Sequence, residues 1–336
     1  MTWKQESDLF YILSVLHPLY KNKYRNDMLK ALWASRINLR RILNKAIENE
    51  VAGSFVQLLV TEGFSNSLLR IALTRFNRSI YLLKRTLNLI LEISNELGKD
   101  LLVIKLHNPY PLTFDDVDLL VRREDFRDIV HALETRGMHD VSKQIKLASI
   151  KHLQHRKQEI SMWKKGFLEI ELYSDFSWSR LDSLDVSFCW QNARKVNIFG
   201  IECSVPSPEA DILILINHAI FKEGKVTLRD FLYINSVLNH KIDIKTLLME
   251  AKKFGWERSF LTLISKLREW YKSPDKILSK KLCFPYMLPL NMICCSILKL
   301  LRTASFREKQ LHPFTPLGYC LSLSWMMNQR IKKWLI

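Results

Sequence analysis

Two aspartates at the start of an apolar stretch are the residues whose types and spacing most clearly suggest chemistry. Asp116 and Asp118 are separated by Val117 and lead into Leu119–Val121. Residues two apart in a β-strand point to the same side, so both carboxylates would project together while Val117 enters the core. Adjacent carboxylates repel each other unless a cation lies between them, and a divalent ion with oxygen ligands, such as Mg²⁺, meets this need. The alternative is a strand end whose acids face water.

A second acidic stretch can add a third carboxylate. Residues 167–173, Phe-Leu-Glu-Ile-Glu-Leu-Tyr, alternate between apolar and acidic side chains, which predicts a strand with Glu169 and Glu171 on one face. We expect this strand to bring Glu171 beside Asp116 and Asp118. Glu169 shares that face and is the substitute for the same role. The alternative is an edge strand whose acids face solvent.

The elements that must position these acids form a short segment of alternating strands and helices. A strand is predicted at Leu101–Leu106, a proline-containing loop follows it, and a helix is predicted over Glu124–Arg136 with Gly137 after its end. A β-hairpin with Gly200 at its turn is predicted over Val196–Val205. The sequence therefore predicts an α+β fold class in which a small mixed β-sheet carries the acids.

Helical periodicity flanks this segment on both sides. Pro18 is expected to end a first helical run. Further helices before the β segment are predicted at Met28–Glu50, Val51–Gly63 and Ser65–Leu97. Helices after it are predicted from Pro208 and near Thr227–Leu238, Ile244–Phe254, Glu257–Trp270, Leu290–Leu301 and Pro316–Trp334. We predict an N-terminal helical region at residues 1–98, an α/β core at 99–206 and a C-terminal helical region at 207–336.

Composition and charge restrict the functional classes. The hydrophobic fraction of 48% and the charged fraction of 25% are typical of a globular protein. The formal net charge of +17, from 51 basic and 34 acidic residues, favours a polyanionic partner such as nucleic acid, nucleotides or an anionic membrane.

Cysteine spacing and motif searches narrow the choice further. The six cysteines form no CxxC pair and are expected to be buried thiols. No P-loop, GxGxxG, HExxH or GxSxG motif is present. With neither a signal-peptide pattern nor an apolar stretch suited to spanning, we expect a cytoplasmic protein without a membrane segment.

Several short motifs, in their order along the chain, resemble the uncharacterised nucleotidyltransferase family of the polymerase-β-like nucleotidyltransferase superfamily. The most specific is Asp-Val-Asp-Leu-Leu-Val at Asp116–Val121. The others are Ile104-Lys105-Leu106, Tyr110-Pro111, Glu171-Leu172-Tyr173, Ser207-Pro208-Glu209, His218-Ala219 and Arg229-Asp230. The resemblance covers about residues 65–255. It implies that the small mixed sheet is a nucleotidyltransferase core flanked by N-terminal and C-terminal helical regions.

Two positions depart from the family pattern. Leu106 follows Lys105 where the superfamily has a glycine that lets backbone amides approach the nucleotide phosphates. Its side chain is expected to obstruct that approach, unless the loop from His107 to Pro111 binds phosphate differently. Tyr173 replaces the family's histidine after the third acid, and we expect this change to affect substrate contacts.

The resemblance implies transfer of a nucleoside monophosphate from ATP or another NTP to an acceptor hydroxyl. Asp116 and Asp118 would hold Mg²⁺ or Mn²⁺. Glu171 would complete the metal site or act as the base for the acceptor hydroxyl. Catalysis of this kind depends mostly on positioning and electrostatics.

Basic residues supply the candidates for binding phosphates and the acceptor. Lys105 is the candidate contact for the triphosphate, and Arg122 or Arg123 for a nearby phosphate, the alternative for both arginines being solvation at a helix end. The net charge and the cations at Lys143–Lys165 favour RNA, such as a tRNA end, as acceptor. Related enzymes also modify proteins and small molecules.

Two further functional classes remain open from the sequence. The first is a catalytically degenerate nucleotidyltransferase-fold protein that binds nucleic acid or a protein partner, for which Leu106 is the best support. The second is the toxin of a toxin–antitoxin pair. No feature of the sequence decides for or against the second.

Overall fold

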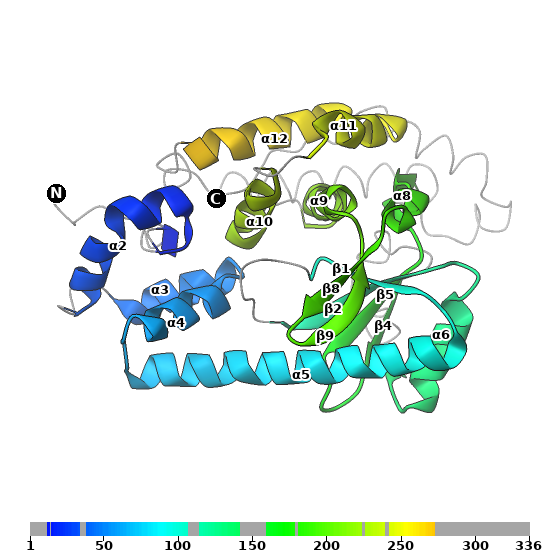
Figure 1. Ribbon diagram of the computed structural model, residues 1–336, viewed down its shortest axis with the longest axis horizontal. Helices are drawn as coiled ribbons and strands as arrows, with labels where there is room; N and C mark the ends of the chain where they lie inside the picture. Colours follow the sequence, from blue (N-terminus) through cyan, green and yellow to red (C-terminus); the bar gives the residue numbers. More distant parts are fainter. Residues whose placement is uncertain are drawn as a thin grey trace, which may run out of the picture.

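The computed structural model describes residues 12–13, 15–33, 38–106, 114–141, 159–178, 181–223, 226–238 and 242–272. The helices predicted at Leu290–Leu301 and Pro316–Trp334, the loop from His107 to Pro111 and most of the Lys143–Lys165 cluster lie outside these residues. Figure 1 shows a β-sheet lying against one long helix, α5, with shorter helices gathered on the far side of the sheet.

The N-terminal part of the chain is helical, as predicted, but most of its helices begin or end at other residues than those predicted. The helices are α2 at Pro18–Trp33, α3 at Leu39–Glu48, α4 at Ala52–Thr61 and α5 at Ser67–Leu97. A first helical run ends at Leu16, with a bend at His17 before Pro18, as predicted. Pro18 then begins α2, whose first turn needs no backbone N–H from it. The segment predicted as Met28–Glu50 contains two helices, since the Asn38 side chain accepts a hydrogen bond from the backbone of Arg41 and caps a new one. Gly98, with φ of 59°, ends α5 as predicted.

A five-stranded mixed sheet carries the acids. Its strands are β1 at Leu101–Ile104, β2 at Asp116–Val121, β3 at His139–Asp140, β4 at Glu159–Trp163 and β5 at Glu169–Tyr173. Their order is β1-β2-β5-β4-β3, with β2 and β5 parallel and the other pairs antiparallel. The strand predicted within residues 167–173 is therefore an interior strand, and the edge-strand alternative is wrong. Strands β3 and β4 were not predicted, because β3 has two residues and β4 adjoins a run of cations.

The remaining described elements are two hairpins and further helices. Two hairpins are formed by β6 at Phe176–Trp178 with β7 at Leu181–Leu184, and by β8 at Arg194–Ile198 with β9 at Ile201–Val205. The helices are α6 at Phe126–Thr135, α8 at Val186–Trp190, α9 at Pro208–Asn217, the π-helix η3 at His218–Glu223, α10 at Leu228–Leu238, α11 at Ile244–Lys253 and α12 at Glu257–Lys272. The predicted hairpin around Gly200 and the helix starting at Pro208 are confirmed. None of the described helices combines the length and apolarity needed to cross a bilayer.

The two faces of the sheet belong to two hydrophobic clusters. Val117 and Ile170 are buried in a cluster with residues of α5 and α6. Leu120 and Tyr173, on the opposite face, join a larger cluster that includes residues of α3, α4, α9, α10 and α12. The carboxylates of β2 point to this second face, so they lie between the sheet and the shorter helices. The architecture is α+β, as the sequence predicts.

Candidate active site

Four carboxylates gather where β2 and β5 begin. The parallel register pairs Asp116 with Glu169 and Asp118 with Glu171, and adjacent strands lie about 4.8 Å apart. Residues paired across a sheet share a face, so these four side chains project together, away from Val117. Asp118 is 7% exposed, whereas Asp116 is exposed and both glutamates are half-buried. The structure thus places the three acids named from the sequence, and their substitute Glu169, at one end of one sheet face.

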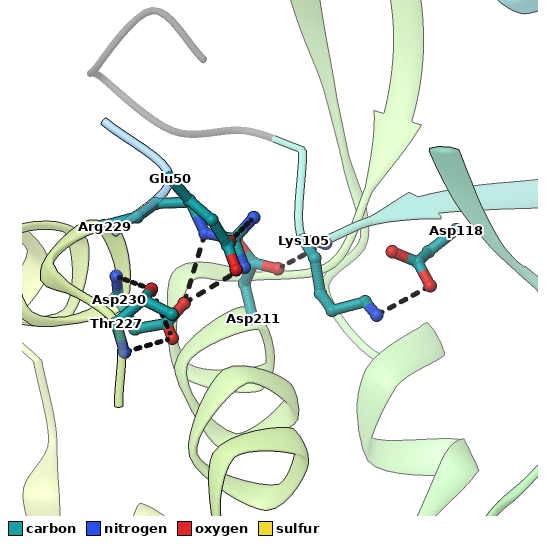
Figure 2. Close-up of polar contacts among 7 residues, drawn as sticks. All are labelled: Glu50, Lys105, Asp118, Asp211, Thr227, Arg229 and Asp230. Atoms are coloured by element: carbon teal, nitrogen blue, oxygen red, sulfur yellow. Dashed lines mark hydrogen bonds and ion pairs between the residues drawn. The ribbon is translucent and has the colours of Figure 1, made fainter. Parts of the chain in front are cut away.

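Lys105 lies directly beside Asp118. Its ammonium Nζ is 2.6 Å from Asp118 Oδ1, and both side chains are about nine-tenths buried (Figure 2). The residue has φ of 62°, which a lysine rarely adopts, and this turn ends β1 one residue after Ile104. Lys105 Nζ also lies 5.4 Å from the ring centroid of Tyr173. Lys105 is therefore the cation that balances the buried carboxylate.

Tyr173 has a contact that the sequence did not reveal. Its hydroxyl donates a hydrogen bond to Glu171 Oε2, and its ring stacks on Phe176 with centroids 6.1 Å apart. The spacing in the sequence could have indicated this contact, since residues 171 and 173 share a face of one strand. Tyr173 thus orients the Glu171 carboxylate.

A buried acid on α9 holds the backbone of Lys105. Asp211 Oδ1 accepts a hydrogen bond from the Lys105 N–H at 3.2 Å (Figure 2). The other oxygen of Asp211 accepts from the hydroxyl of Tyr233. Burial raises the pKa of Asp211 to about 6, although hydrogen bonds from Tyr233 and Lys105 oppose the shift. Sequence reasoning missed this residue. Its signal was a lone acid inside the otherwise apolar run Ala210–Ile216, every residue of which is buried.

A second ion cluster joins the N-terminal helices to α10. Arg229 Nη1 is 2.6 Å from Glu50 Oε2, and Arg229 Nη2 is 3.2 Å from Asp230 Oδ1 (Figure 2). The second oxygen of Asp230 accepts from the backbone and hydroxyl of Thr227 at 3.1 and 2.8 Å. Burial lowers the pKa of Arg229, but Asp230, Glu50 and the nearby Asp118 raise it by more. Arg229 is therefore a fixed positive charge within electrostatic reach of Asp118.

Leu106 does not lie over the carboxylates. Its side chain is 9% exposed and belongs to the core cluster on the opposite face of the sheet, with Phe114. The expected obstruction of the phosphate approach is therefore absent at this side chain.

Arg122 and Arg123 are not brought to the acids. They follow the last residue of β2, about 20 Å along the strand from Asp116. The guanidinium of Arg122 lies 4.2 Å from the ring centroid of Trp190. Residues close in sequence to an acidic strand start are thus remote when a whole strand separates them.

The donor set suits a hard divalent ion, but the acids are not arranged around one. Asp116, Asp118 and Glu171 offer carboxylate oxygens, the ligands that Mg²⁺ prefers. Within the described ranges, no three His, Cys, Asp or Glu side chains lie close enough together to share a metal ion. Asp118 is paired with Lys105, and Glu171 accepts from Tyr173. A cation bound by Asp118 would share this carboxylate with the ammonium of Lys105, which lies on Oδ1.

Comparison with protein families gives a match over half of the chain. A family model described as uncharacterised nucleotidyltransferase matches residues 105–272, which are 168 of the 336 residues. The matched segment begins at Lys105 and contains Asp116, Asp118, Glu171 and Arg229. A search among curated proteins finds no match.

Three solved structures show low similarity. The antibiotic-resistance factor ANT(2'')-Ia in solution is 14% identical, with a TM-score of 0.36, covering 55% of this chain and 98% of the other. An antigenic nucleotidyltransferase-like protein from Paracoccidioides brasiliensis is 16% identical, with a TM-score of 0.37, covering 60% and 94%. ANT(2'')-Ia in complex with adenylyl-2''-tobramycin is 15% identical, with a TM-score of 0.29, covering 57% and 96%. Because these scores are low, the family assignment is based on the family model.

Proposed function

Because the chain belongs to the family of uncharacterised nucleotidyltransferases, we propose that it moves a nucleoside monophosphate from an NTP to an acceptor hydroxyl. The observation that carries the proposal is the parallel pairing of β2 and β5, which collects Asp116, Asp118 and Glu171 on one face beside Lys105. In this reaction the acceptor oxygen bonds to the α-phosphorus, the bond from that phosphorus to the bridging oxygen breaks, and pyrophosphate leaves.

Asp116 and Asp118 would hold the divalent ion. Bound there, Mg²⁺ or Mn²⁺ would neutralise phosphate charge and polarise the reacting phosphoryl group. The half-exposed arrangement suits this task, since Asp118 is fixed by burial while Asp116 stays open to the substrate.

Lys105 would act on the leaving pyrophosphate, and Glu171 on the acceptor hydroxyl. The ammonium of Lys105, beside Asp118, would contact the triphosphate and stabilise the negative charge that moves onto pyrophosphate. Glu171 would accept the proton of the acceptor hydroxyl, with its carboxylate oriented by the hydroxyl of Tyr173. Arg229 would add to the positive potential around the phosphates while Glu50 and Asp230 hold it in place.

RNA is the favoured acceptor. The net charge of +17 supports a polyanionic partner, and an RNA end provides the hydroxyl that the reaction consumes. A small hydroxyl compound and a protein side chain are the competing acceptor classes, and the assay below separates them.

The test uses NTPs labelled at the α-phosphate, with Mg²⁺ or Mn²⁺, and total tRNA, total protein and aminoglycosides as acceptors. We expect the wild-type protein to label RNA. The variant Asp116→Asn with Asp118→Asn should lose this labelling by at least about a hundredfold, as loss of a preorganised electrostatic group does in other enzymes.

A matched variant controls for charge and folding. Glu124→Gln with Asp128→Asn removes the same number of negative charges, from two exposed acids at the opposite end of β2, and should label RNA like the wild type. Equal labelling by wild type and the Asp116/Asp118 variant would end the metal-site proposal. Wild-type protein that binds Mg²⁺ and NTP in thermal-shift assays but labels no acceptor would instead indicate a catalytically degenerate binding protein.

A further inference from the structure

All charged side chains in the first two-thirds of α5 are positive. The helix has 31 residues and is about 46 Å long. Between Glu62 and Glu92 the sequence contains no Asp or Glu. The same stretch contains five cations, all of them exposed: Arg70, Arg75, Arg78, Lys84 and Arg85. A helix whose exposed side was merely solvated would be expected to mix both signs.

Most of these cations lie on one side of the helix. At 100° per residue, Arg78, Lys84 and Arg85 fall within a sector of about 120° that also contains Arg70. Tyr81, near the centre of that sector, is 62% exposed. We refer to Arg70, Arg78, Tyr81, Lys84 and Arg85 as the α5 stripe. From Arg70 to Arg85 it extends about 22 Å, the length of about six phosphates of a stacked strand.

The C-terminal end of the α5 stripe adjoins the acidic end of the sheet. The guanidinium of Arg85 lies 4.4 Å from the ring centroid of Phe167, two residues before Glu169. The backbone N–H of Leu168 donates to Thr86 Oγ1 at 3.0 Å. From this point the first half of α5 runs past the sheet toward α3 and α4 (Figure 1). A polymer bound along the stripe would therefore have one end next to the strand starts that carry the carboxylates.

We infer that the α5 stripe binds the phosphate backbone of the acceptor RNA, an inference that rests on the proposed function. Its arginines and lysine pair with phosphates, and Tyr81 offers a face on which an unpaired base stacks. The stripe lies on the outer side of α5, whereas the carboxylates are on the other side of the sheet. The RNA end passes around the start of β5 to reach them, which favours a single-stranded end over a duplex.

The test measures RNA affinity by fluorescence anisotropy with labelled total tRNA between 50 and 300 mM KCl. The stripe variant is Arg70→Ala with Arg78→Ala and Lys84→Ala. Alanine keeps helix propensity high, so the fold should persist, as circular dichroism would check. The matched variant is Lys245→Ala with Lys252→Ala and Arg268→Ala, which removes three exposed cations from α11 and α12, on the other side of the molecule (Figure 1).

The two variants separate local contact from net charge. We expect the stripe variant to weaken RNA binding about tenfold or more at 100 mM salt and to reduce the slope of log Kd against log salt by about 2 to 3. The matched variant should change the affinity by about threefold or less. Equal losses in both variants, no loss in either, or a stripe-dependent affinity for phosphatidylserine vesicles without one for RNA would each overturn the inference.

The experiments distinguish failure of the RNA-binding inference for the α5 stripe from failure of the proposed nucleotidyl transfer. The Asp116→Asn, Asp118→Asn protein should bind tRNA as the wild type does, and the stripe variant should keep its Mg²⁺-dependent thermal shift with NTP. RNA binding that depends on the stripe, together with no labelling of RNA by the wild type, would support the α5 stripe and refute transfer to RNA.

Discussion

Replacing the buried acid behind Lys105 should make the protein more stable at neutral pH. Asp211 is 3% exposed and accepts hydrogen bonds from the Lys105 N–H and the Tyr233 hydroxyl. Asp211→Asn keeps the shape and one acceptor oxygen for Lys105. Its amide group would face Tyr233, whose hydroxyl oxygen can accept instead of donating. The substitution therefore removes a buried charge with little change in contacts.

The size of the effect follows from the pKa of Asp211. Burial raises it from 3.8 to about 6, so the folded protein binds this proton more tightly than the unfolded chain does. The contribution of this tighter proton binding to the free energy of unfolding is fully present below about pH 4 and is lost as the pH rises through 6. A shift of this size corresponds to about 3 kcal/mol, since one pKa unit is about 1.4 kcal/mol. About 2 kcal/mol of it should be lost between pH 4.5 and pH 8.

Urea denaturation of both proteins at several pH values provides the measurement. The free energy of unfolding of Asp211→Asn minus that of the wild type should rise by about 2 kcal/mol between pH 4.5 and pH 8. In this difference, the contributions that the other titrating groups make to the free energy of unfolding cancel. As a control, Asp243→Asn removes an exposed acid whose pKa is lowered by hydrogen bonds from Thr246 and Lys245, so its difference should hardly change over that range. A flat difference for Asp211→Asn would refute the account of its burial.

Two further substitutions test the ion pairs of the site. Lys105→Met leaves the buried Asp118 carboxylate without its ammonium and should lower the free energy of unfolding by about 3 kcal/mol in EDTA, with Mg²⁺ restoring part of the loss if a divalent ion takes the lysine's place. An equal loss with and without Mg²⁺ would count against that exchange. Arg229→Met should destabilise the protein by about 3 kcal/mol, because Asp230 is buried beside it, whereas the exposed Arg258→Met should have no measurable effect. Similar urea midpoints for these two variants would contradict the role of the Arg229 cluster.

Local patterns in the sequence predicted the elements that carry the site. The alternation of residues 167–173 and the acidic start at Asp116 each specify a strand without reference to the rest of the chain. Their parallel pairing could be expected only as a hypothesis, because it joins segments about 50 residues apart. The position of β5 inside the sheet followed from β4, whose short sequence next to a basic run gave little strand signal.

The supporting residues of the site could not be predicted in the same way. The hydrogen bond between Lys105 and Asp211 joins residues 106 positions apart in the sequence. The ion pair of Arg229 with Glu50 joins residues that are still further apart in the sequence. Such contacts leave no periodicity in the sequence. The position of Arg122 has the opposite cause, because a residue near the acids in sequence is placed away from them by the length of the strand.

The long helix α5 and the first strand β1 lie outside the segment that matches the family model. That segment starts at Lys105, after β1 and α5 have ended. A fragment trimmed to residues 105–272 would lose the strand that pairs with β2 and would uncover Val117 and Ile170 to water. It would also lose Glu50, the anionic partner of Arg229. The part of the chain that buries both faces of the sheet is therefore larger than the segment that matches the family model, and truncation to that segment would expose apolar core residues.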